Sequence, residues 1–101
     1  MKEYNHEKKL VFVIDEDGDS FEVFKQSENY IQNVISPSDN NFKNGYWDES
    51  SGYFIKDNIR VNLEYSNWSG TTLRVDENIG DLSKVRQWAQ DIYNAAHNNN
   101  S

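Results

Sequence analysis

The sequence contains no cysteine among its 101 residues. Disulfide bonds, thiolate zinc sites and thiol catalysis are therefore excluded, and the composition suits a reducing compartment. Long hydrophobic runs are also missing, because the longest spans only residues 10–14, whereas a bilayer-spanning helix needs about 20 apolar residues. The polar residues 1–6 show no secretory signal. We therefore expect no membrane partner and a cytoplasmic location.

Positive charge is scarce in this chain. Ten Lys and Arg residues stand against 17 Asp and Glu residues, which gives a net charge of −7 and a pI near 4.6. This balance disfavours direct binding to nucleic acid or to an anionic membrane, and it favours a basic protein as the charged partner. The basic residues are also too scattered to follow a phosphate backbone.

Groups that could perform catalysis are few. The two histidines, His6 and His97, lie near the ends of the chain, where we expect both to be solvated. A histidine base held beside a nucleophile is therefore not expected. None of the five glycines lies in a phosphate-binding loop pattern. The sequence predicts a protein that is not an enzyme and that has no catalytic residue, metal or cofactor.

Aromatic residues are abundant. They make up 14% of the chain and add buried area to a hydrophobic fraction of only 36%. A chain of this length can bury one core without disulfides or a metal. We therefore expect one globular domain spanning residues 1–101.

The N-terminal part predicts two strands and a turn. Residues 8–14 are mostly apolar on both faces, and residues 21–25 alternate. Asp17-Gly18 between them predicts a tight hairpin turn, because glycine readily adopts a positive φ.

The middle of the chain is less regular. Residues 26–35 fit one helical face, with Ser27 as a possible N-cap and Pro37 as a stop, although residues 30–35 could also be extended. Residues 36–52 are rich in Ser, Asn, Asp and Gly and predict a long loop.

The C-terminal part has clearer signals. Residues 53–56 and 59–66 flank Asp57-Asn58 and predict a hairpin, and residues 71–76 predict a further strand. A final helix is expected to begin near Asp81 or Ser83. Its apolar stripe comprises Leu82, Val85, Trp88, Ala89, Ile92 and Ala96. The elements predict an α+β fold, in which a mainly antiparallel sheet of about five strands packs against the C-terminal helix, with a possible short helix after the second strand.

Acidic residues cluster on the predicted first turn. They are Asp15, Glu16, Asp17, Asp19 and Glu22. A calcium loop of the EF-hand type needs glycine at its sixth position and Glu at its twelfth, and neither is present. The cluster is therefore either a solvated hairpin tip or an acidic edge that binds a positively charged partner.

A second group of candidate binding residues combines rings and carboxylates. Its members are Tyr46, Trp47, Asp48 and Glu49 in the predicted long loop, and Trp68 on a predicted turn. Exposed aromatic residues beside charges are typical of binding hot spots. Alternatively, the tryptophans fold back over the sheet as a lid on the core.

In its size, acidity, lack of cysteine and α+β architecture, the chain resembles the immunity proteins of bacterial toxin systems, including contact-dependent growth inhibition and nuclease colicins. That resemblance implies a non-enzymatic inhibitor that binds and neutralises a basic protein, a cognate nuclease toxin above all. Phage-encoded inhibitors that mimic nucleic acid, such as anti-CRISPR proteins, share the same character. Two further alternatives are a structural or adaptor domain whose acidity serves solubility, and a small hydrolase that uses carboxylates.

Overall fold

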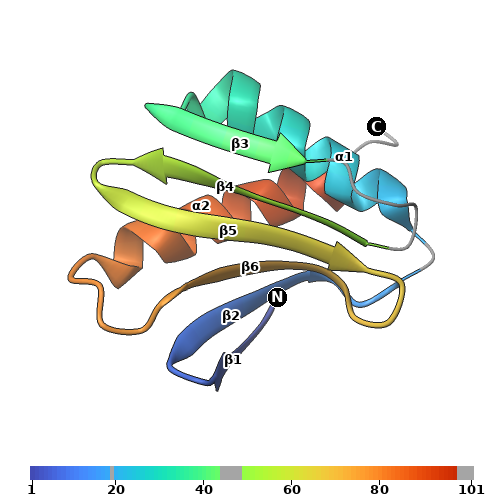
Figure 1. Ribbon diagram of the computed structural model, residues 1–101, viewed down its shortest axis with the longest axis horizontal. Coiled ribbons are helices and arrows are strands. Elements are labelled where there is room, and N and C mark those ends of the chain that lie inside the picture. The colour runs from blue at the N-terminus through green and yellow to red at the C-terminus, as the bar shows by residue number, and fades with distance from the viewer. Residues whose placement is uncertain (19, 44–48, 98–101) are drawn as a thin grey trace.

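The computed structural model contains one six-stranded antiparallel sheet and two helical segments (Figure 1). It describes residues 1–18, 20–43 and 49–97. The strands are β1 (Lys2–His6), β2 (Lys9–Asp15), β3 (Asp39–Lys43), β4 (Glu49–Lys56), β5 (Ile59–Ser66) and β6 (Gly70–Asp76). Their order in the sheet is β1-β2-β6-β5-β4-β3. The α+β fold class is confirmed, with six strands where about five were expected.

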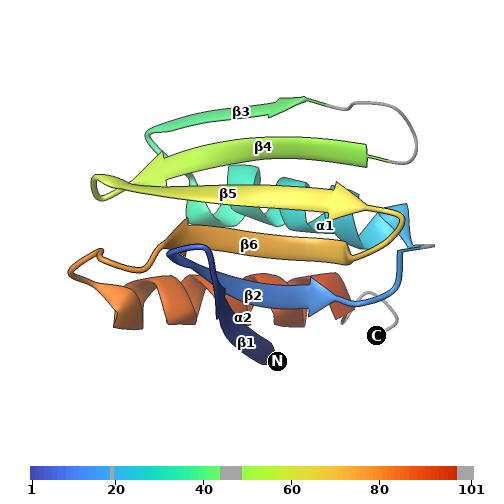
Figure 2. The ribbon, with the colours of Figure 1, turned by 60° about the horizontal axis from the view of Figure 1, so that its bottom comes forward.

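Both helical segments cover the same face of the sheet (Figure 2). They are α1 (Phe21–Tyr30), which continues as the π-helical turn η1 (Ile31–Ile35), and α2 (Leu82–His97). The core lies between the two layers. Leu63 pairs with Leu73, which pairs with Phe12, and all three side chains are buried. The strict alternation along β5 therefore separates a core face from an uncovered face, as the sequence predicts.

The predicted hairpin at Asp17-Gly18 is wrong. Residues 21–25 begin α1, and β2 instead pairs with β1 through the turn at Glu7 and Lys8, which have φ of 50° and 66°. Residues 21–25 form a helix despite their apparent alternation, because helical spacing buries Phe24 against the sheet. It also stacks the Phe21 ring on the Phe24 ring, with 5.5 Å between the ring centroids.

The helix predicted over residues 26–35 exists but begins earlier. Ser27 is not its N-cap; it is buried, and its hydroxyl donates a 2.7 Å hydrogen bond to the carbonyl oxygen of Val23. The segment ends at Ser36, whose φ of 53° breaks the helical path just before Pro37.

The predicted loop over residues 36–52 is also partly wrong, because it contains β3 and the first half of β4. Phe42 pairs with Gly52 across these strands. A Cβ atom on Gly52 would lie 2.4 Å from the Phe42 ring, so only glycine leaves room for the ring at this position. Residues 44–48 lie outside the described residues.

The C-terminal predictions are confirmed. Asp57 and Asn58 adopt φ of 53° and 64° in the turn between β4 and β5. Asp81 precedes α2, where its carboxylate accepts the backbone N–H of Lys84 at 3.4 Å. Trp88 lies at the margin of the core and contacts Phe54 edge-on at 5.8 Å between ring centroids.

The Glu3–Arg86 ion pair links β1 to α2 and predicts a pH dependence of stability. Arg86 Nη2 donates to Glu3 Oε2 at 2.9 Å, and this hydrogen bond lowers the pKa of Glu3 below its ordinary value of 4.5. The pair therefore stabilises the fold above pH 4.5, and we expect this contribution to be lost as pH falls through the lowered pKa. The effect is small because water screens both side chains.

Urea titrations of the wild type and Glu3→Gln from pH 7 to pH 3 would measure this contribution. The wild type is expected to be the more stable at pH 7, and the difference should shrink towards pH 3. A difference that stays constant over this range would contradict the prediction.

Candidate functional site

Six of the predicted site residues lie on segments that meet at one end of the sheet, the end on the right of Figure 1. We call them the acidic end: Asp15, Glu16, Asp17, Glu22, Glu49 and Trp68. They come from five places, namely the end of β2, the connection between β2 and α1, the first turn of α1, the start of β4 and the turn between β5 and β6. The other four predicted residues, Asp19, Tyr46, Trp47 and Asp48, lie outside the described residues.

The connection between β2 and α1 packs directly against the turn between β5 and β6. A Cβ atom on Gly18 would lie 1.9 Å from the carbonyl oxygen of Asn67. One on Gly70, which has φ +74°, would lie 2.0 Å from the carbonyl oxygen of Asp15. Both glycines thus permit a close approach of two backbones. The Tyr65 hydroxyl adds a hydrogen bond to the Gly18 carbonyl oxygen.

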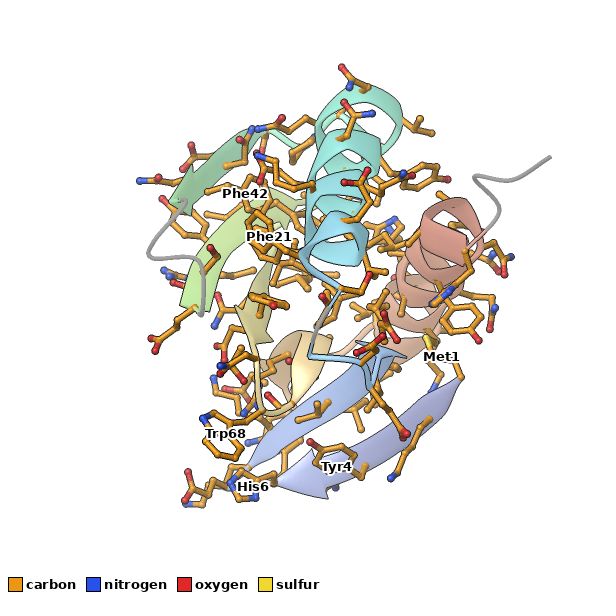
Figure 3. All side chains as sticks on the ribbon, turned by 90° about the vertical axis from the view of Figure 1, so that its right-hand side faces the viewer. Met1, Tyr4, His6, Phe21, Phe42 and Trp68 are labelled. Carbon is orange, nitrogen blue, oxygen red and sulfur yellow. The ribbon has the colours of Figure 1, made fainter. Side chains whose placement is uncertain are left out.

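The turn between β5 and β6 holds Trp68 away from the core. Ser66 Oγ accepts the backbone N–H of Ser69 at 3.0 Å and lies 2.7 Å from Ser69 Oγ, which fixes the turn. The Trp68 side chain is 91% exposed, and Figure 3 shows it pointing away from the protein. The lid alternative is therefore wrong for Trp68.

Glu49 reaches the same end through the strand register. It pairs with Ser66, and Ser66 pairs with Gly70. Glu49 also lines a shallow hollow of about 170 Å³ together with Ser66 and Ser69, the residues that fix the Trp68 turn. The sequence left open whether the two predicted groups share a surface. The strand register places Glu49 and Trp68 at the same end of the sheet as Asp15, Glu16 and Asp17.

The carboxylates of the acidic end are accessible rather than sequestered. Glu16 and Glu22 are exposed. Glu16 lies 3.6 Å from Lys2 Nζ in an ion pair whose two side chains are mostly in solvent, so the attraction is weak. Asp15 Oδ1 accepts the backbone N–H of Asp17 at 3.1 Å. Negative charge here also lies near the start of α1, where the helix dipole favours it.

The contacts of His97 were not evident from the sequence. Its Nε2 donates to the carbonyl oxygen of Ile14 at 2.6 Å, and its ring lies 4.4 Å from that of Tyr93. Both His6 and His97 are exposed, as expected, but His97 is also anchored to β2 through this hydrogen bond. The signal was the spacing of Tyr93 and His97, because residues four apart on a helix are neighbours.

A second polar hollow was missed, on the uncovered face of the sheet. It measures about 290 Å³ and is lined by Asn41, Ser51, Tyr53, Arg60, Asn62 and Glu64. Alternation in residues 59–66 places Arg60, Asn62 and Glu64 on the polar face. No local signal joined them to Asn41, because β3 was predicted as loop; it is the pairing of β3 with β4 that brings Asn41 opposite Tyr53.

No protein-family model matches the chain, and no curated protein or solved structure matches it either. Within the described part of the chain, no group of three or more His, Cys, Asp or Glu side chains is arranged to hold a metal ion. Across the same residues, no helix is both long enough and apolar enough to cross a membrane.

Proposed function

We propose that the protein is a non-enzymatic inhibitor that uses the acidic end to bind and neutralise a basic protein, with a cognate nuclease toxin in the cytoplasm as the partner. The observation that carries this proposal is the 91% exposed Trp68 on a fixed turn that packs against the acidic connection between β2 and α1. Exposing a tryptophan gains nothing for folding, whereas a large flat ring is the residue type most enriched in binding hot spots.

The two components of the acidic end have different physical roles in this proposal. Carboxylates attract a lysine- and arginine-rich surface over a distance set by salt, which raises the association rate. Trp68 then fills a pocket or stacks on a guanidinium group of the partner, which slows dissociation. The exposed Glu16 and Glu22 suit the first role.

Comparative capture from a lysate of the source cells tests the proposal. The wild type is immobilised beside a variant with Glu16→Lys, Glu22→Lys and Glu49→Lys, and bound proteins are identified by mass spectrometry. We expect the wild type alone to retain a basic protein whose nuclease activity falls when the wild type is added. Equal capture by both chains, or a captured protein that remains fully active, would refute the proposal.

The same triple variant predicts a kinetic effect on the captured partner. Reversing three charges removes the attraction that steers the encounter, so the association rate is expected to fall about tenfold at low salt and less at physiological salt. Stopped-flow measurement of the intrinsic tryptophan fluorescence on mixing with purified partner gives this rate.

A matched control reverses three acids away from the acidic end. Glu7→Lys, Glu77→Lys and Asp91→Lys change the net charge equally, and these residues lie in the β1–β2 turn, after β6 and on α2. This control should slow association much less. If both triple variants slow it alike, only net charge matters and the acidic end is not the binding surface.

A further inference from the structure

Arg60 stands apart from the other two arginines of this chain. Arg74 Nε lies 3.4 Å from Glu64, and Arg86 Nη2 lies 2.9 Å from Glu3. Among the described residues, Arg60 has no carboxylate within ion-pairing distance. Acids outnumber bases in this sequence, so the absence of an acidic neighbour within range is not explained by a shortage of acids.

The guanidinium group of Arg60 is nevertheless held in place. It lies 4.1 Å from the centroid of the Tyr53 ring, in a cation–π contact. Its Nε donates to Asn62 Oδ1 at 3.4 Å. The ring contact places the group over Tyr53, and the hydrogen bond to Asn62 uses its Nε and leaves the two Nη groups for a ligand. A planar, oriented guanidinium is the arrangement that binds a carboxylate through two parallel hydrogen bonds.

The surroundings supply further hydrogen-bond donors. The hollow beside Arg60 holds about 290 Å³ and is lined by Asn41, Ser51 and Asn62 as well as Tyr53. Amides and a hydroxyl can donate to the outer oxygens of an anion. The volume exceeds the roughly 30 Å³ share of one water molecule, so a carboxylate with its attached carbon chain fits.

The charges around the hollow favour an anion of single charge. Glu64 also lines it, but its carboxylate is directed to Arg74 at 3.4 Å. That nearby negative charge and the net charge of −7 disfavour a doubly charged phosphate. Apart from the Glu64 carboxylate, which is paired with Arg74, the lining presents one cation and neutral donors to a bound carboxylate.

We propose that Arg60 and Tyr53, with Asn41, Ser51 and Asn62, form a recognition site for a single carboxylate presented by an Asp or Glu side chain of a protein partner. This site lies on the face of the sheet opposite the helices, because its residues alternate with the buried ones along β5. It does not depend on the acidic end, so it stands or falls separately from the proposed inhibitor function.

Titration followed by ¹⁵N NMR of the arginine Nε–H groups tests the site. The probes are sodium acetate, the α-amide of N-acetylglutamate, its neutral glutamine analogue, and sodium phosphate, all at constant ionic strength. We expect acetate and the glutamate amide to shift the Arg60 signal saturably, with dissociation constants on the order of 1–10 mM, as suits a few hydrogen bonds in water. The glutamine analogue should leave that signal unchanged.

Internal and matched controls separate recognition from general charge effects. The Arg86 signal should stay still in the same spectra, because Glu3 already occupies that group. Arg60→Gln and Tyr53→Leu should weaken acetate binding at least tenfold, as followed by the side-chain amide signals of Asn41 and Asn62. Lys25→Gln, which removes a positive charge on α1, should leave the binding intact.

Three results would overturn the proposal. The first is an Arg60 signal that does not move up to 100 mM acetate. The second is an equal movement of the Arg60 and Arg86 signals, which would mean unspecific ion effects. The third is phosphate binding at least tenfold tighter than acetate, which would assign the site to phosphate.

Discussion

Gly70→Ala is expected to lower the free energy of unfolding by about 2–4 kcal/mol. Gly70 has φ +74°, a conformation that costs a residue with a Cβ atom roughly 1–2 kcal/mol. The new Cβ atom would also lie 2.0 Å from the carbonyl oxygen of Asp15, a backbone atom that cannot rotate away. Urea denaturation at pH 7 measures the loss as a lower midpoint.

Gly80→Ala provides the matched control. Nothing lies within 4 Å of a Cβ atom at Gly80, and its φ is not in the left-handed range. The free energy of unfolding of this variant is therefore expected to lie within about 0.5–1 kcal/mol of the wild-type value, and to be higher rather than lower. Equal stability of the two variants would show that β2 and the β5–β6 turn do not approach as closely as described.

Trp68→Ala is expected to weaken binding of the captured partner by about thirtyfold or more while leaving the fold intact. Hot-spot residues contribute at least about 2 kcal/mol to binding, and each 1.4 kcal/mol is a factor of ten in affinity. The free energy of unfolding should change by less than about 0.5 kcal/mol, because the side chain is 91% exposed. Calorimetric titration and urea denaturation give the two numbers.

Two companion variants sharpen this test. Trp68→Phe keeps a smaller ring and should recover part of the affinity. Val34→Ala removes another exposed apolar side chain, 62% exposed on η1, and should leave affinity unchanged. Unaltered binding by Trp68→Ala would remove Trp68 from the proposed interface even if a basic partner exists.

The fold was predictable from the sequence where periodicity and turn chemistry agreed. Strand β5 and the Asp57-Asn58 turn are examples, because alternation and left-handed residues pointed to the same hairpin. The prediction failed at Asp17-Gly18, where a turn signal precedes residues 21–25, whose pattern fits both a strand and a helix. The actual hairpin turn, Glu7 and Lys8, has no turn signature, so its left-handed backbone follows from the pairing of β1 with β2.

The candidate site was predictable only in its parts. Exposure of Glu16 and Glu22 follows from their charge. Their position at the same end of the sheet as Trp68 depends on the close approach of Gly18 to Asn67, two residues that are far apart in the sequence. The sequence alone does not distinguish a glycine that permits two backbones to approach closely from a glycine that permits a tight turn. The Arg60 hollow was hidden for a related reason, since it depends on pairing between β3 and β4.

The adjacency of β2 and β6 has a consequence for how the chain folds. Strands β3, β4 and β5 each pair with the next strand along the chain, whereas β2 pairs with the distant β6, for example Leu10 with Val75. Bringing together ends roughly 65 residues apart costs about 2–3 kcal/mol more in loop-closure entropy than closing a tight hairpin. We therefore expect the β1–β2 hairpin to join a meander that is already largely formed, and the Gly70 contact with Asp15 lies where the two meet. The measurement is a kinetic φ-value, the fraction of a mutation's effect on stability that already appears in the folding rate. We expect low φ-values where β2 meets β6 and higher ones in β5.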